Sequence, residues 1–317
     1  MSGKNRFVLI LPYWGTLPSW FGLYLRSLQG MCFDVLFVSD LEVGAHPDNF
    51  IQLKMSFEEF KRFAADKLSV PIGLEIPIKL CDFKPMYGRI FEDEIRDYGY
   101  WMFGDCDLVY GTSFNAYLER VVREGYDVCT VRRDWVSGAC CILKNTEVCR
   151  NLFMRARNWT EVAGEHGRNN FWDECGGFVH DRLEKGELKM ADCERMRDSF
   201  GAVVFRAKDL KVRHEDDSCE SDLRGQTVVL KEGGDLRLNG REIILFHFVR
   251  AKRRRYFRVC SPRYGEIRSC VIDETGGYFT PRQIAWRRPI GLWRKTMAAF
   301  SSIREHGCRR IGLLFRS

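Results

Sequence analysis

Two apolar runs near the N-terminus constrain the fold of this chain more than any other feature. Phe7–Leu11 is a continuous apolar segment and Phe33–Val38 is apolar except for Asp34; each has the length of a strand. Such apolar runs are typical of strands buried on both faces, as in parallel sheets. Between them, Trp20–Leu28 has its apolar residues at helical spacing. A strand, a helix and a strand form a βαβ unit, so we expect an α/β fold with helices flanking the sheet.

Local signals predict the other elements. Ser56 and Glu59 form a capping box at the start of a helix. Asn239-Gly240 is a type I′ turn signal, and predicts a hairpin. We expect further strands at 49–53, 100–103, 126–131, 139–143, 203–206, 236–238 and 242–248, and further helices at 86–97, 114–124 and 146–158, and from 169.

A pair of carboxylates follows the apolar strand Tyr100–Phe103. Asp105 and Asp107 are separated by one residue, so in an extended segment both side chains point to the same side. They would converge just beyond the carboxyl end of a strand, where open α/β sheets bind their ligands. Two adjacent like charges need a cation, and oxygen ligands suit Mg²⁺ or Mn²⁺. The alternative is a polar turn without a metal.

Composition limits the class of protein. The chain has 317 residues, of which 45% are hydrophobic and 29% charged, as in ordinary globular proteins. Its 13 cysteines include no C-x-x-C pair, which favours buried thiols in a reducing compartment. We find no signal-peptide pattern and no apolar run of the ~20 residues that a membrane-spanning helix needs. The expected location is cytoplasmic.

Three places in the chain resemble the GT-A class of nucleotide-sugar-dependent glycosyltransferases. They are Ser39-Asp40 after the βαβ unit, Asp105-Cys106-Asp107, and His247 at the end of a late strand with Lys252 five residues on. The segments LPYWGTLPSWFGLYLRS, IKLCDFKPMYGRIFED and YWMFGDCDLVYG are similar to an uncharacterised bacterial group of such enzymes, the DUF6625 group, found with surface-polysaccharide genes. The resemblance covers residues 6–255.

The resemblance implies a GT-A-like, Rossmann-type mixed sheet and a metal site. Asp105, Asp107 and His247 would be metal ligands, with Mn²⁺ or Mg²⁺ bridging the diphosphate of the nucleotide sugar. Lys252 would contact phosphate, as a cofactor-binding residue alongside Asp105. Because Lys252 is followed by three arginines rather than by the usual proline and tryptophan, the phosphate contact stays open among Lys252, Arg253 and Arg250.

Further residues have predicted roles in binding or catalysis. The resemblance places Tyr13 and Asp40 beside the base and ribose. Lys79 and Lys84 precede the central strand and would meet phosphates if they face the cleft; otherwise they are solvated. Asp173 and Glu174 are the candidates for a general base that activates the acceptor hydroxyl, the alternative being acids at a helix N-terminus. The loop 135–138 would line the sugar site, and His166, His180 and His214 are expected at the surface.

The implied activity is metal-dependent transfer of a sugar to a glycan or glycolipid acceptor, hexosyltransferase-like, in bacterial surface polysaccharide synthesis. Stereochemistry, sugar and base stay open. We expect a catalytic domain over 1–260, with a donor half at 1–112 and an acceptor half at 113–260, and an extension over 261–317. The alternatives are a non-catalytic sugar-nucleotide or glycan-binding protein of the same fold, and a basic nucleic-acid-binding protein. A nucleotidyltransferase is disfavoured because no Gly-rich phosphate loop occurs near the N-terminus.

The C-terminal tail has a distinct composition. Residues 281–317 contain nine Lys or Arg and one Glu, so the tail carries essentially all of the net charge of +7. Trp286, Ile290, Trp293 and Met297 follow helical spacing, and Pro289 favours a helix that starts there. A basic helix with tryptophans suits the surface of an anionic membrane. We therefore expect peripheral attachment to the inner face of a membrane, and no nucleic-acid partner; the alternative is a helix packed on the core.

Overall fold

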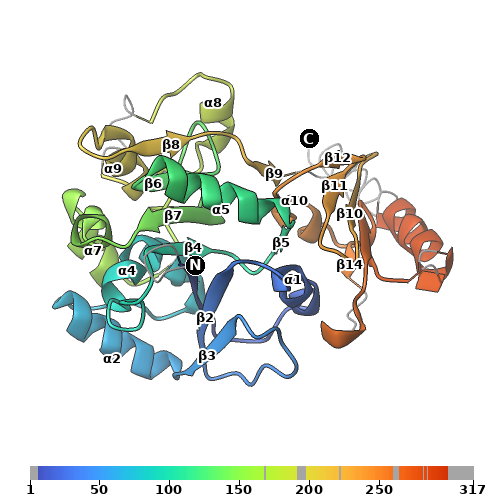
Figure 1. Cartoon of the computed structure of the whole chain (residues 1–317), viewed down its shortest axis with the longest axis horizontal. Helices are drawn as coiled ribbons and strands as arrows, with labels where there is room; N and C mark the ends of the chain where they lie inside the picture. The colour runs from blue at the N-terminus through green and yellow to red at the C-terminus, as the bar shows by residue number, and fades with distance from the viewer. Residues whose placement is uncertain are drawn as a thin grey trace, which may run out of the picture.

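A mixed sheet flanked by helices forms the centre of the structure, as the sequence predicts (Figure 1). The computed structural model describes residues 6–167, 169–190, 198–220, 223–259, 264–280, 282–283 and 285–298. Within these residues the sheet has seven strands in the order β3-β2-β1-β4-β7-β6-β8. They are β1 (Phe7–Pro12), β2 (Phe33–Ser39), β3 (Phe50–Lys54), β4 (Tyr100–Gly104), β6 (Val128–Thr130), β7 (Cys140–Lys144) and β8 (Val212–His214).

The strand order creates a natural place for a ligand. β1 pairs in parallel with both β2 and β4, and β2 pairs in parallel with β3. The chain therefore runs outward from β1 to β3 and returns to the other side of β1 as β4. In doubly wound sheets the ligand binds at the carboxyl ends of the strands where the order reverses, which here is between β1 and β4. β7 is antiparallel to β4, so the loop that enters β7 lies at the same edge.

Helices cover both faces of this sheet (Figure 1). α1 (Phe21–Leu28) and α5 (Ser113–Glu124) share one core with the strands, and α2 (Phe57–Leu68) belongs to the other. The predicted capping box is confirmed at α2, because the Ser56 side chain accepts from the Glu59 backbone N–H and the Glu59 carboxylate accepts from the Ser56 backbone N–H. Each of these amphipathic helices thus buries its apolar side against a face of the sheet.

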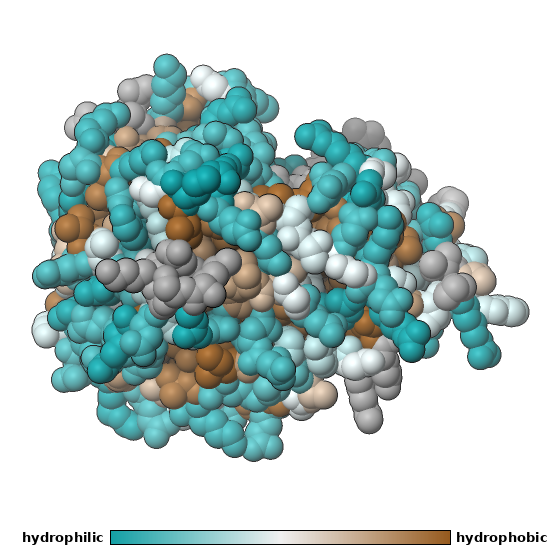
Figure 2. Space-filling view, viewed as in Figure 1, coloured by the Kyte–Doolittle hydropathy of each residue, from teal (hydrophilic) through white to brown (hydrophobic). Residues whose placement is uncertain are grey.

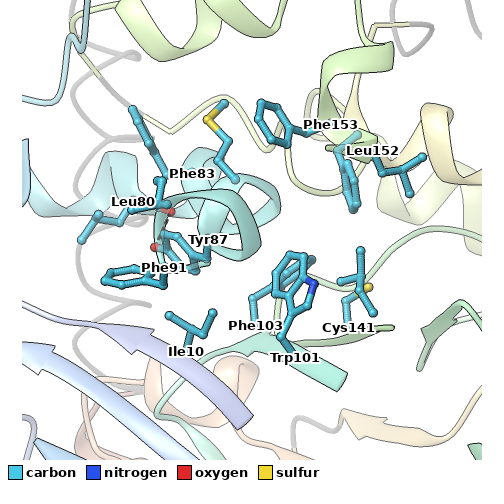
Figure 3. Close-up of a cluster of buried hydrophobic side chains, with 14 of the residues drawn as sticks. Ile10, Leu80, Phe83, Tyr87, Phe91, Trp101, Phe103, Cys141, Leu152 and Phe153 are labelled. Atoms are coloured by element: carbon cyan, nitrogen blue, oxygen red, sulfur yellow. Dashed lines mark hydrogen bonds between the residues drawn. The ribbon is translucent and has the colours of Figure 1, made fainter. Parts of the chain in front are cut away.

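The second of these cores holds several large aromatic side chains (Figure 3). Trp101 and Phe103 of β4 point toward Tyr87 and Phe91, and all four side chains are at most 2% exposed. Gly88 makes this packing possible, since a Cβ there would lie 2.4 Å from the Trp101 indole. The aromatic run that precedes the paired carboxylates is therefore a rigid central strand.

Residues 77–97 form short helices rather than the predicted continuous helix at 86–97. They are η2 (Pro77–Lys79), α3 (Leu80–Phe83), η3 (Lys84–Met86) and α4 (Tyr87–Ile90), followed by turns. The helix predicted at 146–158 likewise divides into α6 (Glu147–Arg150) and η4 (Leu152–Arg155), before α7 (Trp159–Gly164). Proline near the start of η2 and η3 removes a backbone donor, which favours separate turns over one long helix.

The segment predicted as a strand at 203–206 is a helix. α9 (Phe200–Arg206) begins at Ser199, whose side chain accepts from the Ala202 backbone N–H. Phe200, Val203 and Val204 are buried, at the i, i+3 and i+4 spacing of one helix face. The β-propensity of two valines and a phenylalanine was overridden by the cap and by the surface available for burial.

The helix predicted from residue 169 is absent, and residues 172–175 form turns instead. Phe171 has φ 55°, and Gly176 and Gly177 have φ 70° and 155°. Left-handed residues on both sides prevent a helix from propagating. A short helix, α8 (His180–Glu184), follows.

A second sheet lies beside the first, and the described chain gives it six strands in the order β12-β11-β10-β15-β16-β14 (Figure 1). They are β10 (Thr227–Leu230), β11 (Leu236–Leu238), β12 (Arg241–Glu242), β14 (Arg258–Val259), β15 (Cys270–Asp273) and β16 (Gly276–Tyr278). The predicted Asn239-Gly240 hairpin is confirmed between β11 and β12, with φ 48° and 84°. This sheet takes strands from both sides of residue 260, where we predict a domain boundary.

A small sheet joins the two larger ones. β5 (Leu108–Tyr110) pairs antiparallel with β13 (Leu245–His247), which pairs in parallel with β9 (Ser218–Glu220). The register places His247 opposite Leu108. The predicted strand at 242–248 is thus divided between β12 in one sheet and β13 in another.

The C-terminal helix packs on the second sheet (Figure 1). Residues 285–298 are helical on both sides of Pro289, so the helix begins before the proline rather than at it. Arg288 pairs with Asp273 at 2.7 Å and Lys295 pairs with Glu274 at 2.7 Å, which ties the helix to β15 and the turn after it. The rest of the predicted tail, 299–317, lies outside the described residues.

Candidate metal and donor site

The two carboxylates of the Asp-x-Asp motif lie at the reversal point of the central sheet. Gly104 ends β4, and a Cβ there would lie 2.7 Å from the carbonyl oxygen of Ala139. The backbone N–H of Asp105 still donates to that carbonyl at 3.2 Å, so the ladder between β4 and β7 reaches the motif. The Asp105 side chain is 33% exposed and that of Asp107 only 3%. The motif is thus held at the sheet edge with one carboxylate open and the other buried.

His247 completes a cluster of three ligand atoms. The pairing of β5 with β13 carries His247 to Asp107, and its Nε2 lies 3.2 Å from Asp107 Oδ2. One atom from each of Asp105, Asp107 and His247 lies within 4.8 Å of the others, and among the described residues no other such group occurs. Two carboxylates and an imidazole are suitable ligands for a divalent cation such as Mn²⁺ or Mg²⁺. This cluster could therefore hold a divalent metal.

Two lysines that are far apart in the sequence approach the carboxylates. Lys84 Nζ lies 2.7 Å from Asp105 Oδ1, and also donates to the carbonyl of Gly138 at 2.7 Å. Lys252 Nζ lies 2.6 Å from Asp107 Oδ2. Lys252 is brought there by α10 (Val249–Lys252), which begins two residues after β13 ends. Each carboxylate of the motif therefore has its own ammonium group.

These contacts fix the charges of the site. Burial would raise the pKa of Asp107, but His247 and Lys252 hold it well below the usual value of 3.8. Burial would lower the pKa of Lys84, but Asp105 above all raises it well above 10.5. Both groups are consequently charged at neutral pH.

Asp173 and Glu174 lie beside the loop that enters β7. Glu174 Oε1 accepts from the backbone N–H of Gly138 at 2.7 Å, and Oε2 lies 2.9 Å from His180 Nε2. Asp173 Oδ2 lies 3.9 Å from Lys84 Nζ. A Cβ on Gly138 would lie 2.4 Å from Asp173 Oδ2, so the absence of a side chain lets both carboxylates approach. Lys84 therefore lies between Asp105 and Asp173, one of the two acids predicted as the general base.

The two acids differ in environment. Asp173 is 2% exposed, and within the described chain its Oδ1 is buried without a hydrogen-bond partner. Burial raises the pKa of Asp173 well above 3.8, and the charge of Lys84 only partly opposes this. Burial also acts on Glu174, but the hydrogen bond with His180 and the N–H of Gly138 lower its pKa below 4.5. The pKa values of the two neighbouring acids are therefore shifted in opposite directions.

His180 was predicted at the surface, and this is wrong. Its side chain is 25% exposed, lies 2.9 Å from Glu174 and packs edge-on against Trp135 with ring centroids 5.2 Å apart. Burial opposes ionisation, but contacts with Cys175 and Glu174 raise the pKa of His180 to about 10. The turn at Gly176 and Gly177 separates it from Glu174, so no periodic sequence pattern could reveal the pair.

The other residues predicted to bind the nucleotide sugar, Tyr13, Asp40 and Lys79, lie at two different places. Tyr13 follows β1 and Asp40 follows β2, so both lie at the same sheet edge as the motif. The Tyr13 hydroxyl donates to the carbonyl of Thr16 at 2.7 Å, and Asp40 is exposed. Lys79, by contrast, is fully buried, with Nζ 2.9 Å from Asp82 and 3.4 Å from Glu165.

Comparison with known proteins identifies the family. Residues 9–275 match the model of a family described as "Family of unknown function (DUF6625)". The chain belongs to this family. No curated protein matches this DUF6625 chain.

Among solved structures, the apo form of mouse xyloside xylosyltransferase 1 matches the DUF6625 chain with a TM-score of 0.36 and 9% identity. The match covers 68% of this chain and 87% of that one, and is too loose to carry an argument about function. Among the described residues, no helix is both long and apolar enough to span a membrane.

Proposed function

We propose that this DUF6625 protein is a metal-dependent glycosyltransferase that moves a sugar from a nucleotide sugar to a glycan or glycolipid acceptor. One observation carries the proposal: Asp105, Asp107 and His247 gather at the reversal point of an α/β sheet with a lysine on each carboxylate. This combination offers ligands for a cation and positive charge for a diphosphate in one place. A non-catalytic glycan-binding protein would not need it.

The residues of the site have separable roles in this proposal. Sugar transfer breaks the bond between the anomeric carbon and the diphosphate, and negative charge gathers on the leaving phosphate. A bound divalent ion, held by Asp105, Asp107 and His247, supplies Lewis-acid stabilisation of that charge. Lys252, or its neighbours Arg253 and Arg250, binds phosphate, and such preorganised contacts contribute roughly 3 kcal/mol each to transition-state stabilisation.

The sheet edge would bind the rest of the donor. We assign the base and ribose to Tyr13 and Asp40, at the carboxyl ends of β1 and β2. Lys84 would bind the sugar or its phosphate, because its ammonium lies between Asp105 and Asp173. A phosphate role for Lys79 has less support, since its side chain is completely buried against Asp82. In this proposal residues 1–112 form the donor half, completed by His247 and Lys252 from the acceptor half at 113–260, and residues 261–317 form the extension.

We assign the general base to Asp173 rather than to Glu174. A base must accept the proton of the acceptor hydroxyl, and works best when its pKa is close to the operating pH. Asp173 has a raised pKa and an oxygen without a hydrogen-bond donor, whereas both oxygens of Glu174 are engaged. Glu174 and His180 would instead hold the 135–138 loop against the sugar. This role for Asp173 applies to an inverting reaction.

The metal-dependent step has a direct test. Full-length protein is screened by thermal shift against sugar nucleotides with and without Mn²⁺, because a ligand that binds only the folded state raises the melting temperature. The Asp107→Asn variant should lose metal-dependent binding and turnover yet remain folded, while Asp66→Asn, on the exposed surface of α2, should match the wild type. Full activity in EDTA would overturn the proposal.

The base assignment is tested by comparing two conservative variants. Asp173→Asn should lower kcat by about 10²–10⁴-fold with donor binding retained. Glu174→Gln should cost less, because it removes a positioning contact. Equal, wild-type rates in both variants would refute the assignment, and a product of retained configuration would exclude the simple base role.

The acceptor and location are finer parts of the proposal. We propose a hexosyl donor and a lipid-linked acceptor in bacterial surface polysaccharide synthesis, with residues 281–317 attached to the anionic inner face of a membrane. The supporting observation is that Trp286 and Trp293 of the packed helix are 72% and 62% exposed. Co-sedimentation of the full chain with anionic vesicles should be lost in the Trp286→Ala/Trp293→Ala variant. Equal sedimentation of the variant would refute this.

A further inference from the structure

A cavity of about 330 Å³ lies between the C-terminal helix and the second sheet. The helix contributes Arg287, Gly291 and Arg294, and the sheet contributes Arg258 of β14 and Tyr278 of β16. The helix comes very close to the sheet here, since a Cβ on Gly291 would lie 2.9 Å from the Tyr278 hydroxyl. This close approach makes a pocket that the helix shares with the second sheet.

The lining of this cavity is strongly basic. Three arginines line it, and among the described residues that do so none is acidic. The nearest carboxylate on β15, Asp273, is already paired with Arg288 at 2.7 Å and accepts from Thr275 at 2.6 Å. Arg258 donates to the backbone carbonyls of Arg255 and Phe257 at 2.9 and 2.8 Å, which orients its guanidinium group and leaves it charged, so Arg258 and Arg294 would attract an anion into the cavity. The planar guanidinium group matches phosphate oxygens in a bidentate manner, and arginine clusters are typical of phosphate sites.

An apolar row on the same helix reaches the cavity at Ile290. Trp286, Ile290, Trp293 and Met297 are 72%, 47%, 62% and 46% exposed, and recur at the spacing of one helix face. Arg287 and Arg294 each follow one of the two tryptophans directly. A phosphate in the cavity would therefore lie next to a row of side chains suited to the interface of a bilayer, where amphipathic tryptophans and bases are favoured together.

We infer that this cavity binds the phosphate group of an anionic lipid, with the row Trp286, Ile290, Trp293 and Met297 entering the interface beside it. The inference rests on the membrane attachment proposed above. It adds a defined site for a lipid headgroup to the general attraction between the basic tail and an anionic membrane. Arg258 also follows Lys252 by only six residues. A lipid bound here would hold the membrane near the segment that contacts the Asp-x-Asp motif.

The test separates a built site from diffuse charge. Full-length protein without metal is titrated with phosphatidylcholine vesicles that contain an anionic phosphoglyceride. Arg294→Gln and Arg282→Gln each remove one positive charge from the C-terminal segment, but only Arg294 lines the cavity. We expect Arg294→Gln to weaken binding about tenfold more than Arg282→Gln, because hydrogen bonds to a charged group add to the long-range attraction. Arg294→Lys keeps the charge and should still weaken binding, because the fork geometry is lost.

A second arm uses the sheet side of the cavity and a soluble probe. Arg258→Gln should resemble Arg294→Gln, and inorganic phosphate should weaken vesicle binding more than chloride does at equal ionic strength. Equal losses in Arg294→Gln and Arg282→Gln, with no effect of Arg294→Lys, would overturn the site and leave diffuse membrane attachment standing. Failure of the wild type to bind vesicles at low salt would overturn both. Tighter binding of a single-stranded oligonucleotide than of vesicles would also overturn the inference. Binding of the nucleotide sugar, measured separately, tests the proposed glycosyl transfer independently of these vesicle experiments.

Discussion

The buried ion pair between Lys79 and Asp82 should be far more important for stability than a surface pair of the same geometry. Both side chains are completely buried, and Nζ lies 2.9 Å from Oδ2. Asp82 also accepts from the backbone N–H groups of Asn170, at 3.0 Å, and Trp172, at 2.9 Å. The pair therefore fastens the segment that leads into Asp173 onto α3.

The chain contains a matched control for this pair. Glu58 and Lys61 have the same i, i+3 spacing and the same 2.9 Å distance, but their side chains are 67% and 27% exposed. Removing one partner of a buried pair costs about 3–5 kcal/mol, because a charge is left buried without compensation. Removing one partner of an exposed pair costs about 0.2–1 kcal/mol. Lys79→Met should thus destabilise the protein by several kcal/mol more than Lys61→Met.

Urea unfolding at 25 °C, followed by far-UV circular dichroism, measures the difference. The midpoint should fall sharply in Lys79→Met and hardly change in Lys61→Met. Adding Asp82→Asn to Lys79→Met should recover part of the loss, since no uncompensated charge then remains. If the two lysine variants are equally stable, the argument from burial is wrong. If Lys79→Met is stable but loses donor binding, Lys79 contacts phosphate as the sequence predicts.

Two further predictions concern the loop beside the sheet edge. The pKa of His180 is raised from 6.5 to about 10, so its contact with Glu174 stabilises the fold fully below pH 6.5, and this stabilisation is lost as the pH rises toward 10. The stability difference between wild type and His180→Gln, from urea midpoints, should therefore shrink over this range. A constant difference would contradict the prediction. Gly138→Ala should displace Asp173, because the added Cβ would lie 2.4 Å from its Oδ2, and should lower turnover with metal-dependent nucleotide binding retained, while Gly44→Ala, with no atom within 4 Å, should be silent in both assays.

The sequence by itself determined the parallel centre of the main sheet and the position of the Asp-x-Asp motif at its edge. The apolar runs at 7–11, 33–38 and 100–103, interrupted only by Asp34, are typical of strands buried on both faces, and they form β1, β2 and β4. The capping box at Ser56 and the Asn239-Gly240 turn were equally local, because each depends on a few adjacent residues. The Asp-x-Asp motif lies at the end of β4 as predicted, but residues 106–107 form a turn rather than the extended segment that the prediction assumes.

Only the tertiary structure decided what surrounds those carboxylates. The antiparallel pairing of β5 with β13 brings His247 and Lys252 to Asp107 across more than a hundred residues, and no local pattern contains that pairing. Burial converted Lys79, a candidate phosphate ligand, into half of an internal ion pair. Burial likewise favoured a helix for the valines of α9, and the tertiary packing brings His180 to 2.9 Å from Glu174. Sequence periodicity reports which side of an element seeks an apolar surface, but the partner on that surface is chosen by the packing of the whole chain.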